Sequence, residues 1–172
     1  MVTVSENAVN QASDSSVCNL KAGDVIRPRD LLYGLMLRSG NDAAVAIAEY
    51  ISGDVDSFAA LMNQEAAAMG ATRSHFVNPN GLPDENHYTC VYDMYLIFSN
   101  AIKNDTFVSI IGTTSYDVTY TDASGEAVTH TWENTNQYLT GNATTPDGFQ
   151  IVGGKTGTTG EAGYCLVLYS YN

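Results

Sequence analysis

The chain has 172 residues, of which 44% are hydrophobic, and this suits one soluble globular domain with a sizeable core. Nineteen acidic side chains against seven basic ones give a net charge of −12, which repels phosphate backbones and argues against nucleic-acid binding. No apolar run approaches the ~20 residues that a membrane-spanning helix needs, and Met1–Glu6 lack the basic stretch and apolar core of an export signal.

The first half of the chain has the periodicity of α-helices. Pro28 suits the first turn of a helix whose apolar stripe ends near Arg38. Asn41 is a favourable N-cap for a second helix, and Gly53 is a suitable stop for it.

Two further helices follow. One is predicted from about Asp56 to Met69, with Gly70 as its C-cap. After a loop over residues 75–88, the apolar spacing over residues 94–102 predicts the other. We expect the Met and Ala faces of the first three helices to be core rather than a ligand groove, and His75 and His87 to organise their loop through hydrogen bonds.

The second half alternates with period two. The segments 116–120 and 128–132 flank a turn at 122–125, which predicts a hairpin. Residues 149–155 and 164–171 predict two more strands, and the last is apolar on both faces, which indicates an interior strand with Cys165 buried in it. Helices grouped before strands favour an α+β fold, with a helical cluster packed on an antiparallel sheet and residues 1–172 forming one domain.

Lys155-Thr156-Gly157 ends one of these predicted strands. A strand edge can pair with an extended peptide, and glycine lets that peptide approach closely. The Lys155 ammonium and the Thr156 hydroxyl suit a substrate carboxylate. A chance hairpin turn with this composition is the simpler alternative for the motif taken alone.

Ser39-Gly40-Asn41 lies in the tight connection between the first two predicted helices. The Asn41 amide could bind a substrate amide, and Ser39 could pass a proton between a lysine and a leaving group. The simpler alternative is that Ser39 and Asn41 only end one helix and begin the next. The two motifs together are two of the three signatures of serine acyl-transfer enzymes that act on penicillins and D-alanyl peptides.

The surrounding sequence resembles one family over nearly the whole chain. Residues 30–44, 75–82 and 87–94, followed by Asn134-Thr135-Asn136 and residues 153–157, are similar to serine D-alanyl-D-alanine carboxypeptidases, the low-molecular-mass penicillin-binding proteins. The resemblance implies the fold shared by β-lactamases and penicillin-binding-protein transpeptidases. It also implies a location outside the cytoplasmic membrane.

The resemblance assigns roles to the two motifs. Ser39 and Asn41 would occupy the family's second motif and Lys155, with Thr156 and Gly157, its third, while the backbone N–H of Thr158 would form half of an oxyanion hole. The implied reaction is acylation of a serine by a peptidoglycan stem peptide ending in D-Ala-D-Ala, release of D-alanine, and hydrolysis. β-Lactams would act as substrate mimics, and no metal or cofactor is implied.

The family's first motif, Ser-x-x-Lys, does not occur in these 172 residues. We therefore expect a partial domain, truncated at both ends and inactive for want of its nucleophile. Cys18 and Lys21 have the motif's spacing with a thiol in place of the hydroxyl, but a turn signal follows Lys21 directly.

Two other functions and one structural consequence accompany this hypothesis. A non-catalytic relative that binds cell-wall peptides, and a β-lactamase-like hydrolase, would both carry the same two motifs. A truncated sheet would also leave an unpaired edge, and we therefore expect self-association through it.

Overall fold

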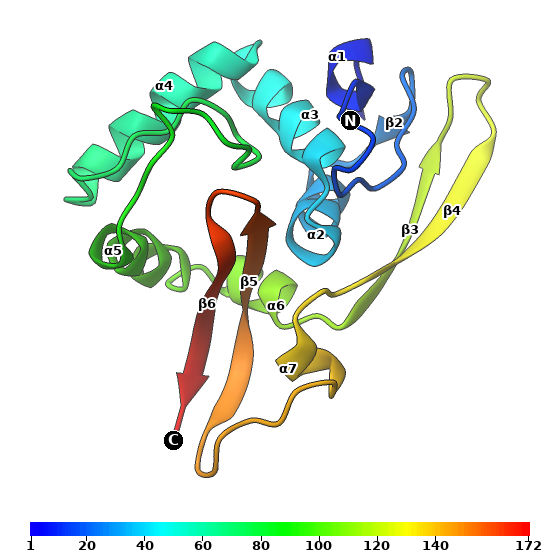
Figure 1. Cartoon of the computed structure of the whole chain (residues 1–172). Helices are drawn as coiled ribbons and strands as arrows, with labels where there is room; N and C mark the ends of the chain where they lie inside the picture. The colour runs from blue at the N-terminus through cyan, green and yellow to red at the C-terminus, as the bar shows by residue number, and fades with distance from the viewer.

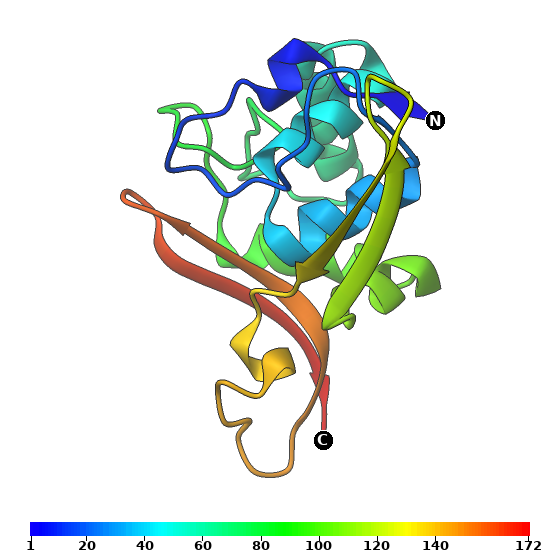
Figure 2. The same cartoon turned by 90° about the vertical axis from the view of Figure 1, so that its right-hand side faces the viewer.

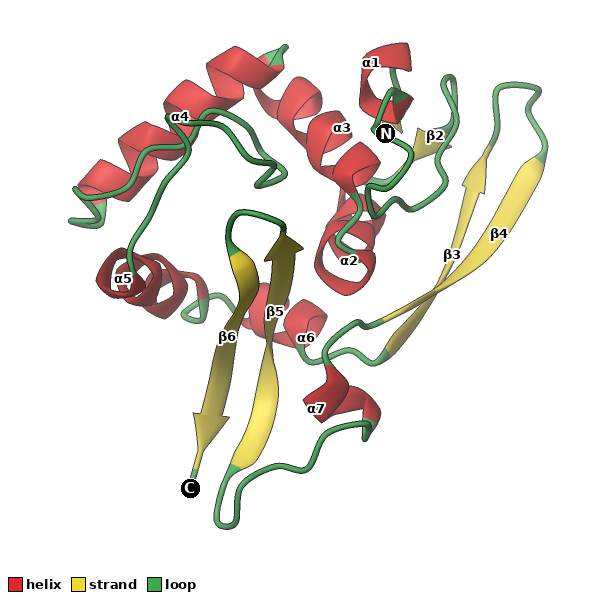
Figure 3. Cartoon of the chain, viewed as in Figure 1, coloured by secondary structure: helices red, strands yellow, loops and turns green.

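The computed structural model describes all 172 residues as helices combined with two antiparallel sheets (Figures 1 and 3). The predicted α+β class is therefore confirmed. None of the helices is long and apolar enough to cross a bilayer. In chain order the elements are β1 Val2–Thr3, α1 Glu6–Val9, β2 Val25–Ile26, α2 Pro28–Arg38, α3 Asn41–Ser52, α4 Val55–Ala68, α5 Val91–Ala101, α6 Asp105–Ile111, β3 Ser115–Thr121, β4 Ala127–Glu133, α7 Gln137–Thr140, β5 Gln150–Thr159 and β6 Gly163–Tyr171.

Helices α2 and α3 lie where the sequence predicts them. Pro28 is the first residue of α2, where its missing N–H costs nothing, and Gly53 ends α3 in the left-handed conformation. The prediction that Asn41 caps α3 is wrong, because Gly40 is the N-cap and Asn41 is the first helical residue. The Asn41 amide nitrogen instead donates to the Ser16 carbonyl at 2.9 Å.

A single carboxylate ties the α2–α3 connection to the segment that precedes β2. Asp42 is 2% exposed, and its oxygens accept backbone N–H groups from Cys18 at 2.9 and 3.0 Å, Leu20 at 3.1 Å and Ala43 at 2.9 Å. A buried carboxylate needs such donors to compensate its lost hydration. The local conformation around Ser39 therefore rests on a tertiary contact as well as on the helix ends.

The third and fourth predicted helices are also present as α4 and α5. The Asp54 side chain caps α4 by accepting the Ser57 N–H at 2.6 Å, and Gly70 follows the helix with a φ of 83°. Helix α6 was not predicted from the sequence, since its seven residues span only about two turns and give little periodicity. The His75 and His87 prediction is confirmed, because both ring Nδ1 atoms make hydrogen bonds within the loop.

The strands form two separate sheets rather than one. β1, β2, β3 and β4 form a four-stranded sheet in that order, and the predicted hairpin is present as β3 and β4 with Val118 opposite His130. β5 and β6 form a two-stranded sheet. The two hairpins lie on different sides of α2 (Figures 1 and 2).

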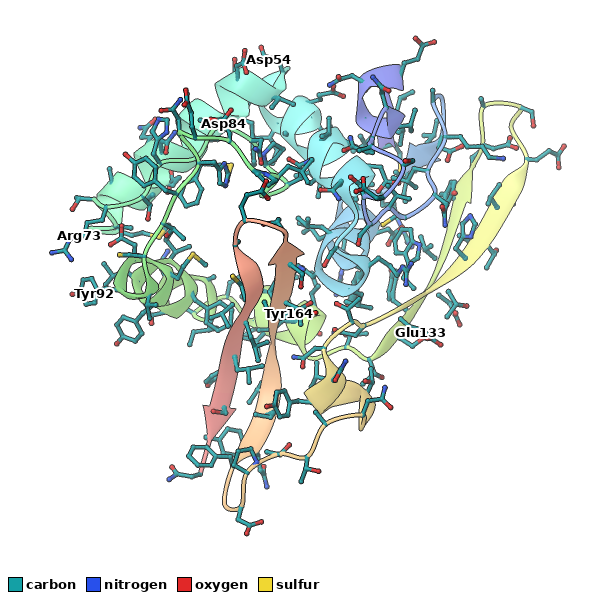
Figure 4. The ribbon with its side chains drawn as sticks, viewed as in Figure 1. Asp54, Arg73, Asp84, Tyr92, Glu133 and Tyr164 are labelled. Atoms are coloured by element: carbon teal, nitrogen blue, oxygen red, sulfur yellow. The ribbon has the colours of Figure 1, made fainter.

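The prediction that the last strand is interior is wrong. β6 pairs only with β5, and Cys165 in it is exposed rather than buried. Tyr164, which is labelled in Figure 4, lies near the start of β6. Its exposed fraction is 95%, and that of Leu166 is 49%. The apolar pattern of β6 correctly indicates a strand. It does not show whether another element packs over that strand, and in this chain several of its apolar side chains are exposed.

The main core lies between the N-terminal segments, α2, α3, α6 and the β3–β4 hairpin, where 17 buried apolar side chains are in contact. Helix α4 contributes less to it than expected, since its two buried residues, Ala59 and Ala66, are outside this cluster and only the partly buried Val55 packs against it. The prediction that its Met face is core is wrong in part, because Leu61, Met62 and Met69 line an apolar groove of about 360 Å³ shared with α5.

We predict that Asp42→Ala destabilises the fold by about 3 kcal/mol, because it leaves buried N–H groups of the 18–20 segment without an acceptor. Urea unfolding monitored by circular dichroism measures this. Asp14→Ala, at an exposed position without a hydrogen bond, is the matched control. Equal unfolding midpoints for the two variants would contradict the role given to Asp42.

We predict that the chain self-associates through the free edge of β6, whose residues Gly163–Tyr171 include no charge and no proline to block edge pairing. Sedimentation velocity should show concentration-dependent association that Leu166→Lys reduces. Thr129→Lys adds the same charge to the exposed edge strand β4 and should leave the association unchanged. A monomer at every concentration would rule the prediction out.

Candidate active site

The α2–α3 turn presents Ser39 in an unusual backbone conformation. Ser39 has φ 54° and ψ 39°, in the left-handed region, and only Asn19 among the other non-glycine residues has a positive φ. The conformation ends α2, and the Gly40 N–H closes the turn on the Gly34 carbonyl at 3.2 Å. A serine is less favourable than glycine in this conformation, so the turn alone does not account for a serine at position 39.

Strand β5 presents Lys155. A side chain on Gly153 would come within 2.6 Å of the Ile111 backbone, so only glycine lets this strand lie against the end of α6. A side chain on Gly154 would approach the Val167 carbonyl to 2.2 Å. These two close contacts determine how near β5 lies to α6 and β6 immediately before Lys155.

The two motifs meet through a direct hydrogen bond from Lys155 Nζ to Ser39 Oγ, between residues 116 positions apart. The amine also donates to the Thr156 carbonyl at 2.6 Å. No carboxylate pairs with it, since the one ion pair in the structure joins Arg27 and Asp30. Burial without an anionic partner lowers the pKa of Lys155 to about 8, so a sizeable fraction of the amine is neutral near that pH.

Thr135 joins both motifs and was not identified from the sequence as a site residue. Its hydroxyl lies 2.8 Å from the Thr156 hydroxyl, and its N–H donates to the Leu37 carbonyl at 3.1 Å. Thr135 therefore connects β5 to the end of α2 close to the Lys155–Ser39 contact. The sequence signal for it was its place in the Asn134-Thr135-Asn136 segment that the family resemblance includes.

The remaining predicted site residues lie further along β5 and at the start of α3. Gly157 and Thr158 continue along β5 and are exposed, on a strand whose other edge has no partner strand. A side chain added at Gly157 would meet no atom nearer than 3.9 Å, so packing within the chain does not require glycine there. Asn41 is 7% exposed; its nitrogen is used by Ser16, while its Oδ1 accepts no hydrogen bond from the chain.

Cys18 does not have the environment of a nucleophile. It is 1% exposed, and burial together with the neighbouring Asp42 carboxylate raises the pKa of its thiol. Its sulfur fills the space beside Gly34 and Gly40, where an added Cβ would come within 2.6 and 2.4 Å of it. Residues 18–21 are not helical, so Lys21 is not placed one helical turn beyond the thiol. The thiol version of the missing motif is therefore contradicted.

Comparison with known proteins places these features in a family context. A family model described as D-alanyl-D-alanine carboxypeptidase matches residues 1–171. The chain is 36% identical over 166 residues to D-alanyl-D-alanine carboxypeptidase DacF of Bacillus subtilis, covering 96% of this chain and 39% of that protein. It is 37% identical over 164 residues to the D-alanyl-D-alanine carboxypeptidase of Streptomyces sp. strain K15, covering 91% of this chain and 54% of that protein.

Solved structures give the same result. The crystal structure of the Streptomyces K15 DD-transpeptidase superimposes with a TM-score of 0.89 at 33% identity, over 99% of this chain and 66% of that one. D-alanyl-D-alanine carboxypeptidase DacD from Francisella tularensis superimposes with a TM-score of 0.83 at 29% identity, over 100% of this chain and 50% of that one. The chain thus spans about two fifths to one half of these curated relatives and half to two thirds of these solved structures.

We predict that Lys155 makes the stability of the fold depend on pH. Its pKa is near 8 when folded and 10.5 in an ordinary environment, so the unfolded chain binds more protons between these values and stability rises with pH in this window. The free energy of unfolding should rise from pH 8 to 10 relative to that of Lys155→Met, by up to about 1.4 kcal/mol per pH unit. Tyrosine ionisation is common to both proteins and cancels in the difference. Parallel stability curves for the two proteins would contradict the burial of the amine.

Proposed function

The chain belongs to the D-alanyl-D-alanine carboxypeptidase family, and from this premise we propose that it is the substrate-binding and proton-relay part of a serine-type D-alanyl-D-alanine carboxypeptidase. The complete enzyme would trim the terminal D-alanine of peptidoglycan stem peptides through an acyl-enzyme. The 172 residues contain no Ser-x-x-Lys sequence, so the attacking serine and its lysine belong, on this proposal, to residues outside these. The 172 residues alone would then be inactive toward the peptide.

The contact between Lys155 and Ser39 carries the proposal. A proton can be passed to a leaving amine only by groups that lie within hydrogen-bond distance of one another. Lys155 Nζ and Ser39 Oγ meet this requirement although they come from opposite halves of the chain. The pKa of Lys155, lowered to about 8 by burial, favours both loss and gain of its proton near neutral pH.

Strand β5 supplies the features that would bind the peptide. Its free edge can pair with an extended substrate, and the absence of a side chain at Gly157 leaves room for that approach. The Lys155 charge and the Thr156 hydroxyl would bind the terminal carboxylate, and the Thr158 N–H would donate to the developing oxyanion. The unpaired Oδ1 of Asn41 would accept a substrate N–H.

The chemistry of this substrate also implies ligands and a location. β-Lactams would bind at β5 as mimics of the D-Ala-D-Ala terminus. The complete protein would act outside the cytoplasmic membrane, where peptidoglycan lies. No metal or cofactor enters the proposed reaction, since hydroxyl, amine and backbone donors supply every proton and charge that it needs.

We predict that the 172-residue chain releases no D-alanine from a peptide ending in D-Ala-D-Ala, and that a longer polypeptide with an upstream Ser-x-x-Lys releases it. In the longer polypeptide, Lys155→Ala should lower kcat/KM by about 10²- to 10⁴-fold, because the relay loses its amine. Lys103→Ala, an exposed lysine outside the site, should leave kcat/KM unchanged.

Two outcomes would count against the proposal. Release of D-alanine by the 172 residues alone would show that no further nucleophile is needed. A longer polypeptide that binds the peptide without cutting it would favour the non-catalytic relative.

A further inference from the structure

We propose that Ser39 is a nucleophile in its own right, with Lys155 as its general base, and that the 172-residue chain transfers small acyl groups from activated esters to water. This activity is separate from D-alanine release and does not rest on it. It differs from the relay role because the Ser39 oxygen itself forms the covalent bond. The proposal uses only groups that these 172 residues contain.

The Lys155–Ser39 contact has the geometry of a nucleophile and its base. The amine is hydrogen-bonded to the hydroxyl, and a second bond to the Thr156 carbonyl holds it in place. A serine is a weak nucleophile until an adjacent base takes its proton. Within the chain, Lys155 is the only side chain hydrogen-bonded to Ser39, so it is the one side-chain base placed to take the Ser39 proton.

The charge around the amine favours the basic form. The chain has 19 acidic residues, yet none forms an ion pair with Lys155. A carboxylate partner would hold the amine protonated, whereas burial without one brings its pKa down to about 8. A neutral amine capable of accepting a proton is therefore present in mildly alkaline solution.

The backbone at Ser39 independently indicates a reactive position. A non-glycine residue in the left-handed conformation carries strain, and such residues occur preferentially at functional sites. Helix α3, which has 12 residues, begins two positions after Ser39, so the positive end of its dipole lies near a developing alkoxide. Ser39 remains partly exposed and is open to a small reagent.

The proposed reaction has two balanced steps. Lys155 Nζ takes the Ser39 proton as Oγ attacks the ester carbonyl; the alcohol or phenol then leaves with that proton, and the acyl group remains on Ser39 as an ester. In the second step the amine takes a proton from water, the hydroxide attacks the ester, and the carboxylic acid leaves as Ser39 recovers its proton. No oxidant, metal or other co-reactant is consumed.

Incubation with p-nitrophenyl acetate tests this on the 172-residue protein. We expect one acetyl group per chain by intact mass, assigned to Ser39 by peptide mapping and removed by neutral hydroxylamine, which cleaves esters but not amides. The rate of p-nitrophenol release should rise with pH about a midpoint near 8, following the neutral amine.

Four variants separate the proposal from background acetylation. Ser39→Gly keeps the left-handed turn without strain, and it should slow the reaction at least about tenfold, as should Lys155→Met. Ser13→Gly and Lys103→Met change an exposed serine and an exposed lysine and should have no effect. Thermal melts by circular dichroism verify that each variant is folded.

Three results would overturn the proposal. One is an acetyl group that maps to Lys155 or another residue and resists hydroxylamine. Another is an unchanged rate in folded Ser39→Gly. The third is a pH profile that Lys155→Met does not alter.

Discussion

The hydrogen bond between a partly buried amine and a serine hydroxyl is the contact on which the chemistry proposed for this molecule depends. Lys155 lies within β5, a strand that two glycines allow to pack closely against α6 and β6. The sequence predicted that the strand ends at Lys155, whereas it continues to Thr159. Ser39 lies in the α2–α3 turn. The Asp42 carboxylate connects this turn to residues 18–20 by accepting their backbone N–H groups. Neither the strand nor the turn creates a site alone, and both are needed to bring the two atoms into contact.

Burial determines what this contact can do. In a chain with net charge −12, an isolated cation would ordinarily find a carboxylate partner, yet Lys155 has a hydroxyl and a carbonyl instead. Burial, which no anionic neighbour offsets, lowers the pKa of the amine to about 8, close to the range in which a group both accepts and donates protons efficiently. The same amine remains a cation at lower pH and can attract a carboxylate.

The sequence predicted local structure well and tertiary context less well. Helices α2 to α5 and both hairpins follow from periodicity, proline and glycine positions, because these signals act within a few residues. The N-cap prediction for α3 is wrong by one residue: Gly40 occupies the cap, and the Asn41 side chain donates instead to the carbonyl of Ser16 in a distant segment. β6 was misassigned as interior because an apolar pattern identifies a strand but not the element that covers it.

The sequence pointed to both partners of the Lys155–Ser39 contact but not to the residue that connects their segments. Ser39 and Lys155 were identified from two short motifs and the family resemblance around them. The structure then shows that their side chains are hydrogen-bonded to each other. Thr135 was overlooked because a threonine after a strand has no local signature, and its role depends on contacts with Leu37 and Thr156. Cys18 could be excluded as a nucleophile only from the burial of its thiol and the charge of the neighbouring Asp42, and residue spacing along the chain reveals neither.

A double-mutant cycle with Ser39→Gly and Lys155→Met tests the central contact most directly, because the backbone relief at residue 39 occurs with and without the lysine and cancels. We expect the two substitutions to be non-additive in the free energy of unfolding, with a coupling of about 1 kcal/mol or more. Additivity within about 0.3 kcal/mol would mean that the amine and the hydroxyl do not interact, and would contradict the account.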